Sequence, residues 1–302
     1  MAADAIGRRL SERAPGDGLP DAAARRVFSA AGRDYRWSEV IVAARFRGDW
    51  PRPARGASAA SVDEWRRRRG LLSADDTIAW LERWGLELSD VRRHVGREDE
   101  GEPGNGDRAA WAQAVCSGEL TGLARGLAAA VAVTADPPEA ASALDAATLA
   151  RLDAEFERWL AAVEASDAVP ALIDADAAGW TTVVAHALAF SELEAAREAA
   201  LCVRHDSMSL AEVAALSGSE LVELRVMLDD LVEPVRGLVA GAVAGELLGP
   251  FADGGAYQVL CVVSKQPPNA DDPVVLARAR SLAVARAIDR ASSARIVWYD
   301  RL

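Results

Sequence analysis

Residues 180–190, WTTVVAHALAF, constrain the fold more than any other segment of this chain. Its β-branched and aromatic residues favour a strand, and residues 257–263, YQVLCVV, form a second strand of the same kind. Most of the remaining chain is rich in alanine and carries apolar residues at helical spacing. We therefore expect an α+β protein in which helices are the majority.

His186 lies in the middle of the first of these strands, and the chain has only 3 histidines. Side chains alternate along a strand, so His186 shares a face with Leu188, and Gln258 shares a face with Leu260 in the second strand. If the strands are neighbours, the imidazole and the carboxamide can satisfy each other's donors and acceptors. A structural histidine of this kind and a histidine in the floor of a peptide groove both fit the sequence.

The length of 302 residues and the apolar content of 51% fit two domains with sizeable cores. The net charge of −12 makes duplex nucleic acid a poor partner, because its binding depends on basic side chains that neutralise phosphates. Residues 66–69, four consecutive arginines, are a local exception. They are consistent with a solvated helix face or with a docking site for an acidic peptide.

Familiar catalytic and metal-binding patterns are absent from the sequence. Its 3 cysteines are far apart and have no CxxC spacing, which argues against a zinc site and indicates a reducing compartment. The sequence contains no G-x-S-x-G, H-E-x-x-H or G-x-x-x-x-G-K-[ST] motif. The first 16 residues lack an apolar signal core, and the longest apolar run, 126–135, is too short to cross a bilayer. We expect a cytoplasmic protein without metal, cofactor or membrane contact.

Helix signals and turns divide the chain into a weakly ordered segment 1–24, a helical domain 25–169 and an α+β domain 170–302. Capping serines predict helices that begin after Ser38, Ser61, Ser73 and Ser191, and apolar spacing predicts further helices at 108–133, 145–165 and 271–293. The stretch 219–246 is predicted to be mostly helical, with a break at Pro234. The closing strand 295–298 is expected to pair with the strand near Val27.

Two stretches of the C-terminal half resemble the parvulin-type peptidyl-prolyl isomerase domain. AHALAFSELEAAREAALCVRHDSMSLAEVAALSG is similar to the opening strand and two helices of that family, and GELLGPFADGGAYQVLCVV is similar to its G-E-x-x-G-P…G-Y-H-I-I ending. The resemblance places His186 at the first core histidine of the family. It implies a parvulin-like fold for residues 170–302.

Upstream, RDYRWSEVIVAARFRGDW and WRRRRGLLSADDTIAWLERWGLELSDV resemble the helical N-terminal region of SurA-type chaperones and of cytosolic parvulin-related proteins. Those cytosolic relatives belong to bacterial peptide-maturation systems, in which ribosomally made precursor peptides are modified. The fold that this resemblance implies is a helical SurA-like region followed by a parvulin-like domain. The likeness covers about two-thirds of the chain.

The departures from the parvulin pattern concern the catalytic site. Gln258 stands where the family has its second core histidine, and the segment between the second helix and GELLGP is short and lacks the Gly-Gly-Asp-Leu-Gly stretch. Rotation about an X-Pro bond needs a complete, partly desolvated pocket. We therefore expect a degenerate site with weak or absent isomerase activity.

The sequence thus predicts a non-catalytic protein that holds a ribosomally made precursor peptide for modification during natural-product biosynthesis. The alternatives are an active prolyl isomerase or general chaperone, and a scaffold that binds only proteins. Its partners would be the precursor peptide and a tailoring enzyme, and a homodimer stays open. The residues expected to form the peptide groove come from the two strands: His186, Leu188, Phe190, Tyr257, Gln258 and Leu260.

Overall fold

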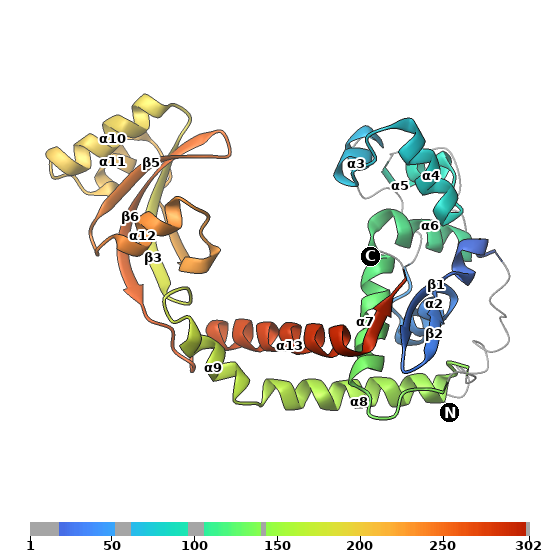
Figure 1. Cartoon of the computed structure of the whole chain (residues 1–302). Coiled ribbons are helices and arrows are strands. Elements are labelled where there is room, and N and C mark those ends of the chain that lie inside the picture. Colours follow the sequence, from blue (N-terminus) through green and yellow to red (C-terminus); the bar gives the residue numbers. More distant parts are fainter. Residues whose placement is uncertain (1–17, 52–61, 96–105, 140–142, 300–302) are drawn as a thin grey trace. The chain divides into compact units, whose positions relative to one another are not determined.

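The computed structural model of the chain describes residues 18–51, 62–95, 106–139 and 143–299 (Figure 1). Its contacts form two compact units: the first unit comprises Met1–Ala162 with Ala285–Leu302, and the second unit comprises Val163–Val284. Each unit combines helices with a small antiparallel sheet, which confirms the α+β class. Residues 285–302, expected within the C-terminal domain, are grouped with the first unit because their strand pairs there.

The sheet of the first unit joins the two ends of the described chain. Its strand order is β2-β1-β7, and all pairs are antiparallel: β1 (Arg26–Ala30), β2 (Arg33–Arg36) and β7 (Ile296–Trp298). Phe28 lies opposite Trp298, with ring centroids 5.4 Å apart, so the expected pairing of the closing strand near Val27 is confirmed. Tyr299 extends this contact through a hydrogen bond from its hydroxyl to Asp34 (2.8 Å).

Helices pack around this sheet, and their tryptophans form the core. Trp37 and Trp111 are fully buried, and Trp65 is nearly so. Ser73, the cap expected at the start of one helix, is confirmed and forms a capping box with Asp76. The helical elements are η1 (Asp21–Ala24), α2 (Trp37–Arg47), α3 (Val62–Arg68), α4 (Ala74–Trp84), α5 (Leu88–Val95), α6 (Asp107–Ser117), α7 (Glu119–Val133) and α8 (Ala146–Glu164), the last of which continues into the second unit.

Three helix boundaries in this unit differ from the expectation or lie outside the described residues. Helix α2 begins at Trp37 and has Arg36 as its N-cap, so the prediction of Ser38 as the cap was wrong. The stretch 108–133 is two helices, because Gly118 takes a left-handed conformation (φ 87°) between them. The predicted cap Ser61 lies outside the described residues.

The arginine run 66–69 stabilises the first unit rather than forming only a solvated face. Arg66 donates hydrogen bonds to the Thr77 hydroxyl (2.8 Å) and to the Ser73 carbonyl (2.8 Å). Arg69 donates to the carbonyl of Cys116 and stacks 4.8 Å from the ring centroid of Trp65. These guanidinium groups join α3 to its neighbours, so the docking of an acidic peptide has no support here.

The second unit is built on a four-stranded antiparallel sheet of order β4-β3-β6-β5 (Figure 1). The strands are β3 (Thr182–Phe190), β4 (Val222–Met227), β5 (Leu247–Asp253) and β6 (Ala256–Gln266). Helices α10 (Leu193–His205) and α11 (Leu210–Ser217) follow β3, as the parvulin resemblance predicts. The other helical elements are α9 (Ala168–Ala175), η2 (Leu228–Asp230), α12 (Val235–Gly241) and α13 (Pro273–Arg295), the last of which continues into the first unit.

Two local predictions for the second unit were wrong. The stretch 219–246 is not mostly helical, because residues 222–227 form strand β4 against β3. Helix α10 has Glu192 as its N-cap, without a side-chain hydrogen bond, instead of Ser191. In contrast, Ser209 and Glu212 form a capping box at the start of α11.

Each face of the sheet carries its own core. On the α10 face, Leu188, Phe190 and Val259 pack with residues of α10 and α11. On the α12 face, Val183 and Val262 pack with Val239 of α12 and with other residues of that side. Only those predicted groove residues that lie on the same face of the sheet can line one peptide groove.

Candidate peptide-binding surface

The six predicted groove residues lie on opposite faces of the sheet. Leu188 (0% exposed) and Phe190 (9%) are part of the core of the α10 face, and Tyr257 packs against that core. Leu260 (7%) is part of the core of the α12 face. The structure therefore gives most of these side chains a packing role, and they do not line one common groove.

His186 and Gln258 do not meet, so the expected contact was wrong. Strand β3 does pair with β6, but His186 lies opposite Cys261 and Gln258 lies opposite Ala189. A bulge also puts them on opposite faces: the register shifts by one residue between Val184 and Ala185, and Val263 is the extra residue on β6. A shift of one residue turns every later side chain to the other face.

The polar groups of Gln258 are used elsewhere. Its side-chain amide donates a hydrogen bond to Asp253 (2.8 Å) on the neighbouring strand β5. His186 is half-buried on the α10 face, between Cys261 on one side and Glu223 of β4 on the other. Burial raises the pKa of the Cys261 thiol, which disfavours the thiolate needed for nucleophilic chemistry.

The sheet has two edge strands, and they differ in how open they are to another strand. On β5 the register shifts between Leu248 and Phe251, and Pro250 in this bulge has no N–H. Gly249 is held so close to β6 that an added Cβ would lie 2.7 Å from the Gln258 carbonyl oxygen. Bulges and prolines are the usual protection of an edge. Strand β4 has neither of them and pairs with β3 in a regular register from Thr182 to Ala187.

The hydrogen bonds next to β4 show which of its backbone groups are open. The N–H of Leu228 donates to the Thr181 carbonyl (3.0 Å), in the same register as the β3–β4 ladder. Hydrogen-bonded and non-hydrogen-bonded pairs alternate in an antiparallel ladder. The N–H and C=O groups of Val226 and Leu224 therefore face β3, and those of Arg225 and Glu223 face away from the sheet.

The side chains of β4 alternate in the same strict way. Val222 (43% exposed), Leu224 and Val226 lie on the α12 face, opposite Ala187, Ala185 and Val183. Glu223 and Arg225 are exposed on the α10 face. Apolar and charged residues thus alternate in VELRV, a strand signal that the helical interpretation of 219–246 missed.

The second unit carries almost all of the net charge of the chain. Residues 163–284 contain 18 acidic and 7 basic side chains, a formal charge of −11 out of −12 for the whole sequence. Among the described residues, Arg225 is 3.6 Å from Asp272, whereas Glu223 has no ion pair. The open edge therefore belongs to a strongly acidic unit.

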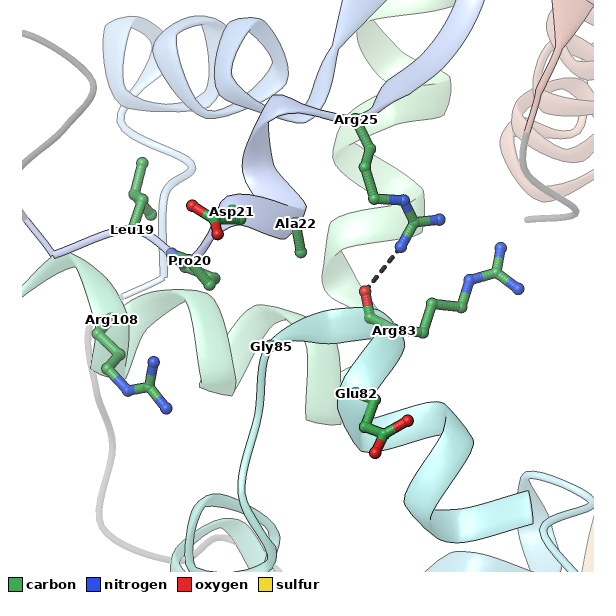
Figure 2. A pocket seen from close by; sticks show the side chains of 9 residues that line it. All are labelled: Leu19, Pro20, Asp21, Ala22, Arg25, Glu82, Arg83, Gly85 and Arg108. Atoms are coloured by element: carbon green, nitrogen blue, oxygen red, sulfur yellow. Dashed lines mark hydrogen bonds between the residues drawn. The ribbon is translucent and has the colours of Figure 1, made fainter. Parts of the chain in front are cut away.

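A separate surface pocket lies in the first unit (Figure 2). It has a volume of about 680 Å³ between η1 and the end of α4. Arg25 donates a hydrogen bond to the Arg83 carbonyl (2.7 Å) and lies 5.7 Å from the ring centroid of Trp84. Arg108 approaches Asp90 (3.6 Å). These contacts connect residues that line the pocket to neighbouring parts of the first unit.

The described residues show neither a metal-binding cluster nor a membrane-spanning helix. No group of three or more histidine, cysteine, aspartate or glutamate side chains in the described ranges could hold a metal ion. Among the described helices, none combines the length and the apolar character that crossing a membrane requires.

Comparisons with known proteins give little further guidance. No protein-family model matches the chain, and no curated protein matches it. One of the solved structures that match comes from work on two structurally related SurA-like chaperones of Campylobacter jejuni, the virulence factor PEB4 and a periplasmic protein. The identity is 9%, the TM-score is 0.21, and the match covers 91% of this chain and 99% of the other. A superposition this poor carries no conclusion about function.

Proposed function

We propose that this protein binds a polypeptide segment in extended conformation, which pairs with β4 as a fifth strand of the second unit. The observation that carries the proposal is the difference between the two edges, since β5 is bulged and β4 is regular and open. Strand addition of this kind gains affinity from main-chain hydrogen bonds and specificity from alternate side chains.

The chemistry of β4 indicates which segments would bind. The open N–H and C=O groups of Glu223 and Arg225 would pair with the backbone of the segment. On the α12 face, its side chains would lie beside Val222, Leu224 and Val226, which favours apolar residues at alternate positions. The charge of −11 on the second unit favours a segment with basic residues between them.

We further propose that the bound segment belongs to a ribosomally made precursor peptide, which the protein presents to a tailoring enzyme. The support is the resemblance to parvulin-related proteins of peptide-maturation systems. A binding role without catalysis is favoured because Gln258, at the position of the second parvulin histidine, is bonded to Asp253 and lies away from His186.

Calorimetric titration of the full chain tests this proposal. An alternating Lys-Val peptide should bind, an alternating Glu-Val peptide should bind much more weakly, and a Lys-Val peptide N-methylated at every lysine, whose N–H groups would point to β4, should lose the binding. Leader and core fragments of a precursor encoded beside the gene then test the precursor role. Equal binding of the N-methylated peptide would refute strand addition. Catalysis of prolyl isomerisation that falls on His186→Ala would refute the non-catalytic role.

A further inference from the structure

The sequence of β4 is complementary to itself. In Val222-Glu223-Leu224-Arg225-Val226, Leu224 is the centre, a glutamate and an arginine flank it, and a valine stands at each end. We propose that two copies of this protein pair through their β4 edges, antiparallel and centred on Leu224, and form one continuous sheet across the dimer. This inference does not depend on the peptide-binding proposal, although it uses the same edge.

The backbone of β4 fits such a pairing. Around a twofold axis at Leu224, Glu223 of one copy lies opposite Arg225 of the other, and the reverse. These are the residues whose N–H and C=O groups point away from β3. Each Glu223–Arg225 pair can therefore exchange two backbone hydrogen bonds. Leu224 then faces its own copy in a pair without hydrogen bonds, where side chains approach most closely.

The side chains fit the same register. Glu223 and Arg225 both lie on the α10 face, so the twofold axis places opposite charges next to each other twice. On the α12 face, Leu224 meets Leu224, and Val222 meets Val226. Arg225 is 58% exposed and its contact with Asp272 is long (3.6 Å), so other donors of its guanidinium can reach a second copy.

The pairing has a consequence for ligand binding. A second copy and a peptide would use the same backbone groups of Glu223 and Arg225, so each excludes the other. The charge of −11 on each second unit opposes close approach of two copies, whereas it attracts a basic peptide. Without a ligand, the second copy would thus cover the β4 edge, and a basic peptide segment would displace it.

Sedimentation velocity of the full chain, without peptide, tests the proposal through charge exchange. The wild-type chain should show a concentration-dependent dimer. Glu223→Arg places two arginine pairs in the interface and Arg225→Glu places two glutamate pairs there, so each variant alone should dimerise at least tenfold more weakly. The double variant E223R/R225E restores opposite charges and should dimerise as the wild type does.

Sedimentation of a mixture of the two single variants is the most decisive experiment, because a folding defect in either variant could not produce a heterodimer. In a mixed pair, both arginines of E223R meet both glutamates of R225E, so the mixture should form a heterodimer although each variant alone dimerises at least tenfold more weakly than the wild type. A wild-type chain that stays monomeric at all concentrations, or a mixture without heterodimer, would overturn the proposal. Peptide binding by a monomeric variant would then show that strand addition stands without dimerisation.

Discussion

Proline substitutions at neighbouring positions of β4 should have very different effects on the stability of the second unit. The N–H of Leu224 faces β3, so Leu224→Pro removes a ladder hydrogen bond, leaves a carbonyl of β3 without its donor, and deletes part of a half-buried side chain. Together these losses amount to about 3 kcal/mol. The N–H of Glu223 faces outward, so Glu223→Pro loses no internal bond and should cost about 1 kcal/mol or less through backbone restriction.

Native-state hydrogen exchange measures this difference within the second unit alone. The opening free energy of the β3 amides should fall strongly in Leu224→Pro and little in Glu223→Pro. At concentrations where the wild-type chain is monomeric, the amides of Leu224 and Val226 should exchange slowly, whereas those of Glu223 and Arg225 should exchange quickly. Protection of Glu223 and Arg225 with fast exchange of Leu224 would reverse the assigned alternation and refute strand addition at this edge. Protection of Glu223 and Arg225 beside slow exchange of Leu224, lost on dilution, would instead indicate the dimer.

Three further predictions concern the first unit. Burial raises the pKa of the Cys116 thiol from 9.0 to about 12, so the unfolded chain ionises first and urea titrations should show stability that is lost as pH rises from about 9 towards 12. Trp298→Ala should cost about 2 kcal/mol in the same assay, because the ring packs on Phe28, whereas the exposed neighbour Val297→Ala should cost little. Arg69→Met should lower the urea midpoint of unfolding clearly more than Arg67→Met. Arg69 donates a hydrogen bond to the Cys116 carbonyl and stacks on Trp65, whereas Arg67 is exposed.

Elements with a strong local signal were predictable from the sequence. The strands β3 and β6 are long apolar runs, and their residue types leave few alternatives. The starts of helices α4 and α11 are marked in the sequence by Ser-x-x-acid capping boxes at Ser73 and Ser209. The pairing of β7 with β1 was predicted from two short strands at opposite ends of the chain.

Elements decided by tertiary contacts were not predictable in the same way. In residues 222–227 the alternating strand pattern competes with apolar residues at helical spacing, such as Leu224 and Leu228, and pairing with β3 decides for the strand. The bulge at Val263 has no local signal such as glycine, yet it determines whether His186 and Gln258 share a face. The inserted residue therefore separates His186 and Leu188 from Gln258 and Leu260, whereas the adjacent residues Tyr257 and Gln258 lie on opposite faces in any register.

The two edges of the second unit explain why β4 is the better candidate for function. Exposed regular edges invite unwanted pairing, and proteins usually block them with bulges, prolines or inward charges. On β5 this chain uses a bulge, Gly249 and Pro250, but on β4 it keeps a regular strand with an apolar row on one face. An edge of that kind avoids unwanted pairing when something covers it at least part of the time. A second copy and a basic peptide are the two occupants that fit the charges of Glu223, Arg225 and the acidic unit around them.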